Sequence, residues 1–135
     1  MNKIRGYVSS RQFMGESCHQ STQNLVIRDY CERSSLVYLL SGVEYSINNS
    51  FLMLNELASQ IPDLIDGVVA YSLFQLPENP EERGDIYEKF LENNGEIHFA
   101  LEGLKITNYS ELLRVEQIWL VRQTMQNCIT TIYDD

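Results

Sequence analysis

Short apolar runs alternate with helical segments along this chain, and this alternation is the feature that most limits its fold. The predicted strands and helices occupy residues 4–8, 19–33, 36–40, 48–60, 67–71, 80–92, 96–101 and 110–125. Such an alternation is typical of right-handed β-α-β crossovers and a parallel sheet. We therefore expect a three-layer α/β fold with a mainly parallel sheet of four strands in the order 2-1-3-4. Residues 130–135 add a fifth strand in this prediction or are disordered.

Two segments carry the clearest local signals. The third predicted strand lies in the run DGVVAYSL, which is almost continuously apolar, as expected of a strand buried on both faces. Pro80, followed by two acidic residues, predicts a helix start, and Asn93-Asn94-Gly95 predicts its end. Asn48 or Asn49 is the predicted cap of the second helix, and Ser110 that of the last.

Composition narrows the class of protein. A chain of 135 residues predicts one domain, residues 1–135. The net charge of −9 repels phosphate backbones and argues against nucleic-acid binding. Three widely spaced cysteines imply no disulfide framework, and no apolar run approaches the ~18 residues of a membrane span. We expect a cytoplasmic protein without membrane contact.

The predicted topology places a candidate site where strand order reverses, beyond the carboxyl ends of the first and third strands. The segments that follow these strands are Ser9–Gln12 and Ser72–Gln75. Glu44 and Glu102 follow the other two strands and border the same edge. The candidate catalytic residues are Ser9, Ser10 and Glu102, and the candidate ligand-binding residues are Arg11, Gln12, Glu44, Ser72 and Gln75.

The chemistry of these residues leaves alternatives open. A serine at the rim is a nucleophile if a base removes its proton, and Arg11 beside it suits an anionic oxygen. Equally, the serines cap loop backbone. Ser72 and Gln75 suit a neutral ligand such as a sugar, or else their loop only packs Leu73, Phe74 and Leu76 onto the core.

Other chemical signals are weak. Cys18 lies beside His19 at a predicted helix start, a position that suits a reactive thiol, but packing or capping is the simpler interpretation. His98 lies within a strand and is expected to be a core histidine. The spacing of the two histidines predicts no metal site. No glycine-rich phosphate loop is present, so no cofactor is predicted.

The last predicted helix is more apolar than one buried face requires. We expect either a homodimer through this helix, with Leu112, Leu113 and Trp119 at the interface, or ordinary packing on the sheet.

The first strand, ending Gly6-Tyr7-Val8-Ser9-Ser10, is followed by Gln20 and Gln23 and by Asp29-Tyr30-Cys31. This order resembles the start of the serine recombinase catalytic domain, and the run Ile97–Glu102 resembles its fourth strand. The resemblance spans roughly residues 3–125 and implies a resolvase-like fold. The family's arginine cluster, which stabilises charge on the scissile phosphate, is absent: Ser9 stands at one arginine position, and Ser72–Leu76 replaces an arginine-bearing segment.

The strings GYVSSRQFMGE, NLVIRDYC, VAYSLFQLPE and HFALEGLKI resemble the sporadic carbohydrate cluster family, which is encoded among bacterial surface-polysaccharide and lipopolysaccharide genes. This resemblance implies a role in surface-carbohydrate biosynthesis, as a small enzyme or as a binder of a sugar or nucleotide-sugar, without recombinase chemistry and without a nucleic-acid partner. One alternative is a non-catalytic dimeric scaffold or regulatory module. A second is a degenerate serine-recombinase-like protein that acts on DNA.

Overall fold

The computed structural model describes the backbone of residues 2–13 and 17–133, and side chains as far as residue 125. The elements are β1 (Lys3–Val8), α1 (Gln20–Arg33), β2 (Val37–Val43), α2 (Leu52–Ser59), β3 (Gly67–Ala70), the short 3-10 helix η1 (Leu73–Gln75), α3 (Pro80–Glu92), β4 (Glu96–Phe99), β5 (Leu104–Ile106) and α4 (Tyr109–Tyr133). Part of the polar loop predicted over residues 9–17 lies outside the described residues.

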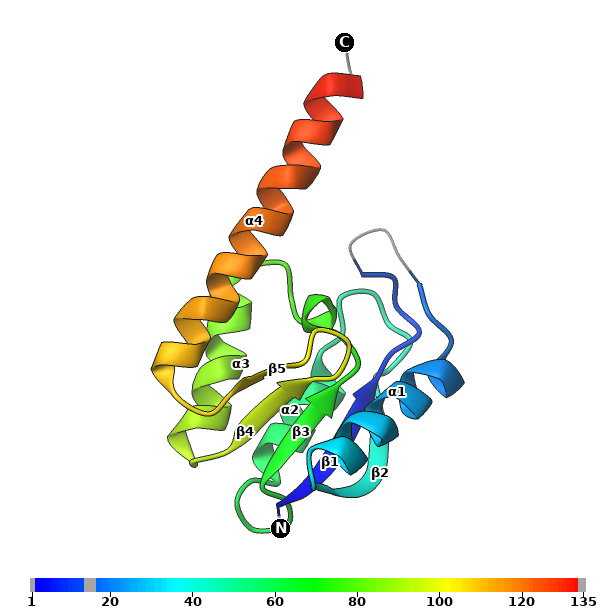
Figure 1. The fold of residues 1–135 in the computed structure, drawn as a ribbon, viewed down its shortest axis with the longest axis vertical. Coiled ribbons are helices and arrows are strands. Elements are labelled where there is room, and N and C mark those ends of the chain that lie inside the picture. Colours follow the sequence, from blue (N-terminus) through cyan, green and yellow to red (C-terminus); the bar gives the residue numbers. More distant parts are fainter. Residues whose placement is uncertain (1, 14–16, 134–135) are drawn as a thin grey trace.

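The strands form one five-stranded sheet in the order β2-β1-β3-β4-β5 (Figure 1). The first four are parallel to one another, as predicted, and β5 pairs antiparallel with β4. The fifth strand is not formed by residues 130–135, because α4 continues to Tyr133. It comes from a turn after β4 in which Gly103 adopts a positive φ of 67°. The strand predicted over residues 96–101 therefore ends earlier, at Phe99.

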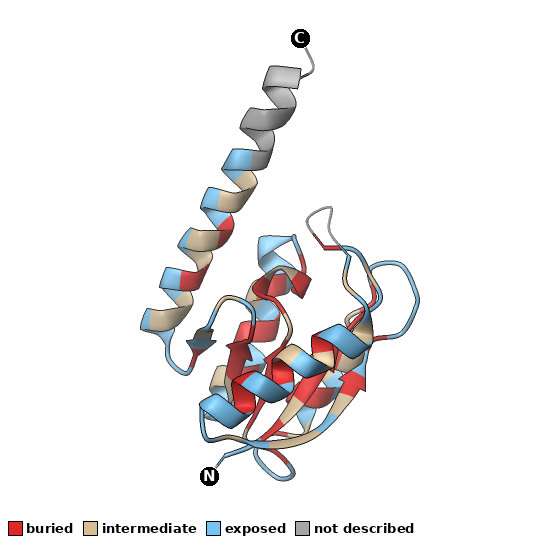
Figure 2. Cartoon of the chain, turned by 45° about the vertical axis from the view of Figure 1, so that its right-hand side comes forward, coloured by how far each residue is buried: buried red, intermediate tan, exposed pale blue. Residues whose placement is uncertain are grey.

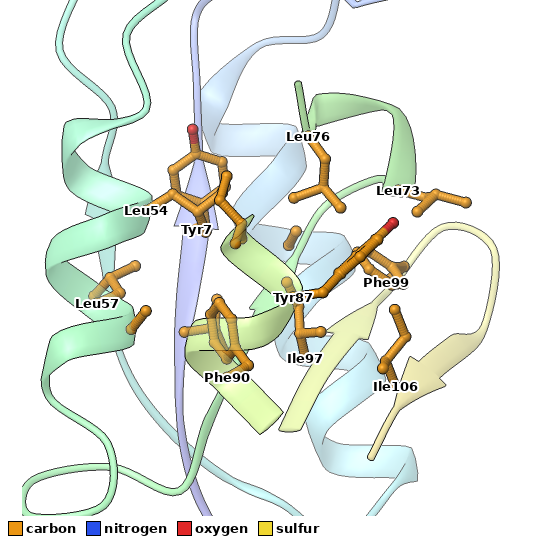
Figure 3. Close-up of a cluster of buried hydrophobic side chains, with 14 of the residues drawn as sticks. Tyr7, Leu54, Leu57, Leu73, Leu76, Tyr87, Phe90, Ile97, Phe99 and Ile106 are labelled. Atoms are coloured by element: carbon orange, nitrogen blue, oxygen red, sulfur yellow. The ribbon is translucent and has the colours of Figure 1, made fainter. Parts of the chain in front are cut away.

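Alternate strand residues face two separate cores, which gives the molecule three layers. On one face, Val8 and Val69 pack against Ile27 and Cys31 of α1. On the other face, neighbouring strand residues pack against α2, α3 and the first half of α4. Figure 3 shows this larger core, with side chains that include Tyr7, Leu54, Tyr87, Phe90 and Phe99. The rest of α4 projects away from the body (Figure 1), and residues 120–125, the last whose side chains are described, are exposed or partly exposed (Figure 2).

The hydrogen bonds at the first turns of the helices show which of the predicted caps are correct. Asn79 accepts the backbone N–H groups of Glu81 and Glu82, directly before Pro80, which confirms the predicted start of α3. The caps predicted for the second and last helices are wrong. The carboxylate of Glu44, from the end of β2, accepts the N–H of Met53 at the start of α2, and Asn108 rather than Ser110 caps α4.

The order of the strands places the candidate site. The order in which the chain adds strands reverses between β1 and β3, so the chain leaves these two parallel strands toward helices on opposite faces of the sheet, and the candidate site lies at this edge. None of the described helices is both long and apolar enough to cross a bilayer.

Candidate functional site

The two loops predicted to form the site lie side by side at the carboxyl edge of the sheet. The guanidinium of Arg11, after β1, donates to the backbone carbonyl of Gln75, after β3, over 2.7 Å. The side-chain amide of Gln75 donates to Oε1 of Gln23 on α1 at 2.9 Å. The predicted location of these loops is therefore correct. Gln23 also links the loop after β3 to α1.

Ser9 is buried, and both its backbone N–H and its backbone carbonyl are hydrogen-bonded. Its N–H donates to Oε1 of Gln23 at 3.1 Å, and its carbonyl accepts from Nε2 of Gln23 at 2.7 Å. Its hydroxyl accepts the N–H of Arg11 at 3.1 Å, which stabilises the turn after β1. Ser9 therefore shapes the loop from inside, while Ser10 is exposed on its surface.

Arg11 is held in one place by several groups. Besides Gln75, its guanidinium donates to the carbonyl of Ser50 at 2.8 Å and to the hydroxyl of Tyr7 at 3.2 Å. It also lies 4.3 Å from the centre of the Phe51 ring, a cation–π distance. A guanidinium with this many fixed acceptors loses little freedom when an anion approaches.

Glu44 is linked to Arg11 through Tyr7 and Ser50 and is 3% exposed, so it does not reach the surface. It accepts hydrogen bonds from the hydroxyls of Tyr7 (2.9 Å) and Ser50 (3.0 Å) as well as from the N–H of Met53 (3.0 Å). Burial is the main reason that the pKa of Tyr7 is raised far above its ordinary value, so its hydroxyl keeps its proton and donates to Glu44. Glu44 therefore supports the site and anchors α2.

Ser72 and Gln75 are also buried, each 1% exposed. The Ser72 hydroxyl donates to Glu102 at 2.7 Å, and the N–H of Leu73 donates to the same carboxylate at 2.7 Å. Burial, only partly offset by these bonds, raises the pKa of Glu102. These side chains satisfy one another inside the protein, so they fix the shape of the loop after β3.

The surface that remains open is small and polar. A hollow of about 390 Å³ is bordered by Arg11, Gln12, Phe51 and Phe74, with Glu78 and Glu82 at its rim. Ser10, Arg11 and Gln12 also line a second hollow of about 470 Å³. Of the eight predicted site residues, these three are the ones a ligand can meet directly.

Sequence reasoning omitted three residues from the site. Gln23 joins both loops, Tyr7 connects Arg11 to Glu44, and Ser50 contacts both of them. In the sequence, Gln23 and Tyr7 stood out only as part of the segment that resembles the serine recombinase domain. The order of residues in that resemblance was the one signal that pointed to them.

The predicted dimer surface on the last helix needs a correction. Trp119 is fully buried, with its ring 4.9 Å from that of Phe74 and 4.2 Å from the guanidinium of Arg83. Leu112 is partly buried against the same core, whereas Leu113 is 65% exposed. Trp119 cannot contact a second copy, because α3 and η1 already cover it.

No protein-family model and no curated protein sequence matches this chain. Two solved structures are similar to it across nearly its whole length. One is a resolvase family site-specific recombinase from Streptococcus pneumoniae, with a TM-score of 0.64 and 13% identity, covering 98% of this chain and 99% of that one. The other is the N-terminal catalytic domain of TP901-1 integrase, with a TM-score of 0.57 and 14% identity, covering 93% and 98%. The chain has a resolvase-like fold.

These similarities overturn two expectations. The predicted role in surface-carbohydrate biosynthesis, with a sugar or nucleotide-sugar ligand, is wrong, because both similar structures come from recombination proteins and no sugar-cluster family was found. The exclusion of nucleic acid as a partner fails for the same reason. It relied on the net charge of −9, but total charge does not describe the field at one edge of a fold.

Proposed function

We propose that this chain is a DNA-acting protein of resolvase-like fold whose recombinase chemistry is degenerate. The observation that carries the proposal is the end-to-end similarity to a site-specific recombinase, which covers 98% of this chain and 99% of the other. The part that meets DNA in this proposal is the loop after β1. With this role the protein would work in the cytoplasm, where it meets DNA.

Ser10 is the hydroxyl that suits an encounter with a DNA phosphate. It is exposed after the carboxyl end of β1 and lines the same hollow as Arg11, whose guanidinium is fixed. Attack by this hydroxyl on phosphorus would form a serine–phosphate bond and break the bond from phosphorus to a sugar oxygen, and the serine proton would pass through water to that sugar oxygen, which leaves as a hydroxyl. The buried hydroxyl of Ser9 is occupied by the N–H of Arg11 and has no such access.

The charges around the two hollows favour DNA binding without strand cleavage. Among the described residues that line the two hollows, Arg11 is the single basic side chain, and Glu78 and Glu82 oppose it. Charge that develops on a phosphate during transfer needs several fixed donors for stabilisation. We therefore expect weak DNA binding that depends only modestly on salt, because few phosphates are neutralised, and little or no strand cleavage.

The test measures binding and covalent capture separately. Fluorescence anisotropy with a labelled duplex, at several salt concentrations, measures binding by the wild type, by Ser10→Ala and by Ser110→Ala, an exposed control on α4. A nicked suicide duplex followed by denaturing electrophoresis detects a serine–DNA adduct.

We expect binding at low salt that Ser10→Ala weakens and Ser110→Ala leaves unchanged. An adduct that Ser10→Ala abolishes would show that cleavage chemistry survives. Absence of any binding at the lowest salt would reject the proposal.

A non-catalytic module that assembles through α4 is the second candidate. Leu113, Leu120, Val121 and Met125 recur at helical spacing on α4 and are 57–65% exposed. Several exposed large apolar side chains on one helix suit an interface. Sedimentation velocity on Leu120→Glu tests it, with Leu101→Glu, exposed on another part of the molecule, as the control. A wild type that remains monomeric at high concentration would contradict this candidate.

A further inference from the structure

His98 on β4 makes a buried contact with helix α1, away from the candidate site. Its side chain is 4% exposed, as expected of a core histidine. Nδ1 of His98 lies 2.6 Å from the hydroxyl of Tyr30 on α1, and the two rings meet at 64°. Because α1 packs over β1, β2 and β3, this hydrogen bond extends the attachment of the helix to the next strand of the sheet.

The surroundings of the ring decide which group donates in this bond. Nε2 of His98 is 3.3 Å from Oε1 of Glu96, so a proton on Nε2 avoids two lone pairs that face each other. Burial raises the pKa of Tyr30, which keeps the proton on its hydroxyl. The Tyr30 hydroxyl therefore donates to Nδ1. This bond requires the neutral imidazole, because a protonated ring has no acceptor.

A second proton on His98 would find no well-directed partner. Nε2 is buried and makes no hydrogen bond with any described residue, so its N–H direction misses Glu96. Oε1 of Glu96 already accepts from the side-chain amide of Asn2 at 2.8 Å. Protonation of Nδ1 would force the Tyr30 hydroxyl to turn away, and it would place a charge in a buried position, which is costly.

The charged groups around His98 act in both directions. Glu96 on β4 and Glu111 in the first turn of α4 favour a positive ring, whereas Lys105 on β5 opposes it. Arg33, the last residue of α1, is also positive and lines the same hollow of about 520 Å³, and β3 places an apolar residue opposite His98. Burial outweighs the two carboxylates, so the pKa of His98 is lowered from 6.5.

We propose that His98 is a pH-sensitive latch for helix α1: the neutral ring accepts the Tyr30 hydroxyl and holds α1 against β4, and protonation breaks this hydrogen bond and loosens the helix. Gln23 lies about two turns before Tyr30 on the same buried face of α1. Acid would therefore loosen the helix that connects both loops of the candidate site. This inference does not depend on the proposed function.

The direction of the pH effect follows from a comparison with the unfolded chain. In the unfolded chain the imidazole titrates near its ordinary pKa of 6.5, above its pKa in the folded protein. The stability that neutral His98 contributes is therefore complete above pH 6.5 and is lost as the pH falls from 6.5 through the lowered pKa. The unfolding equilibrium constant should rise by about a factor of ten for each pH unit that separates the two pKa values.

Two measurements on the full chain test the latch. NMR titration of the imidazole Cε1–H groups gives the pKa of His98 and that of His19, the exposed second histidine of the chain. Urea denaturation over the same pH range compares the wild type with His98→Gln, whose amide oxygen can accept from Tyr30 but which carries no charge. His19→Gln is the matched control.

We expect the wild type and His19→Gln to become less stable than His98→Gln as the pH falls below 6.5, by the factor that the measured pKa of His98 sets. Tyr30→Phe keeps the ring and removes the hydroxyl, so its difference in stability from the wild type should shrink with acid. This variant keeps the test informative if His98→Gln does not fold. A His98 pKa at or above 6.5, or a constant difference between the wild type and Tyr30→Phe, would overturn the proposal.

Hydrogen exchange locates the effect, because it reports the opening of each helix separately. After correction for the intrinsic pH dependence of exchange, α1 should open at least about threefold more often, relative to α3, below the pKa of His98 than above it. His98→Gln should remove this change. Equal responses of α1 and α3 in the wild type would show that His98 does not act on α1, and the proposal would fail.

Discussion

The side-chain amide of Gln75 donates a 2.9 Å hydrogen bond to Oε1 of Gln23, and this bond connects the loop after β3 to helix α1. Gln23 also holds both backbone groups of Ser9, so one buried amide joins the two loops of the candidate site. Buried polar networks with every group satisfied give a single conformation, and a partly satisfied network is costly.

Gln23→Ala should therefore be strongly destabilising. The substitution leaves Ser9 N–H, the carbonyl of Ser9 and the amide of Gln75 without this partner in a buried place. We expect a loss of about 2–4 kcal/mol from desolvated, unpaired groups. Urea denaturation measures it, with Gln117→Ala, exposed on α4, as the control; a loss below that of the control would contradict this account.

Two glycines should respond oppositely to alanine. A Cβ at Gly67 would lie 2.3 Å from the carbonyl oxygen of Glu96, because β3 and β4 approach closely there. Gly67→Ala should cost about 1–3 kcal/mol, since backbone must shift. Gly84, inside α3, has nothing within 4 Å of the added carbon, so Gly84→Ala should stabilise the fold by roughly 0.5–1 kcal/mol.

Thermal unfolding of both glycine variants checks the pair. A Gly84→Ala protein that melts below the wild type would show that the helical propensity of α3 is offset by an interaction absent from this structure.

Replacing Arg83 with lysine should lower the stability of the folded protein. It is 3% exposed, forms an ion pair with Glu116 at 3.0 Å, and donates to the carbonyls of Pro77 and Glu78. Its planar group also stacks 4.2 Å from the centre of the Trp119 ring. Lysine cannot make these contacts together, so Arg83→Lys should cost about 2–4 kcal/mol.

Tryptophan fluorescence during urea unfolding follows this change, since Trp119 is the single tryptophan of the chain. Arg114→Lys, on the exposed side of α4, is the control. Equal midpoints for the two variants would refute the role assigned to Arg83.

Cys31 should resist thiol reagents in the folded protein. Burial raises its pKa from 9.0 to about 11. The thiolate fraction at pH 8 is therefore lower by about a factor of 100, because each pKa unit is a factor of ten. Alkylation followed by peptide mass spectrometry should label the partly exposed Cys18 well before Cys31. Equal labelling rates would contradict the burial of Cys31.

Glu102 should make stability depend on pH. Burial raises its pKa above the ordinary 4.5, so the folded protein binds this proton more tightly than the unfolded chain does. The stabilisation that protonated Glu102 contributes is complete below pH 4.5 and is lost as the pH rises through its raised pKa. Relative to Glu102→Gln, the wild type should lose stability over that window, as measured by urea denaturation at a series of pH values. A constant difference between the two proteins would contradict the raised pKa.

Much of this architecture could be predicted from short-range patterns. The apolar run of β3 and the signals around Pro80 and Asn94 depend on neighbours in sequence, so they predicted a parallel sheet and the bounds of α3 correctly. The positions of the loops Ser9–Gln12 and Ser72–Gln75 followed from strand order alone.

Contacts between distant residues were decided only by the tertiary structure. Glu44 replaces the local asparagines as the cap of α2 because folding carries the end of β2 to that helix. Trp119 is covered by η1 and α3 because α4 packs against them, which its apolar sequence does not reveal. In the same way, only the packing of the fold decides that Ser9 is buried and Ser10 is exposed. The sequence by itself determined the first four strands and the four main helices, since those depend on local periodicity, but not β5 or the end of α4. The accessibility of each polar side chain was decided by packing, because it depends on residues far away in the chain.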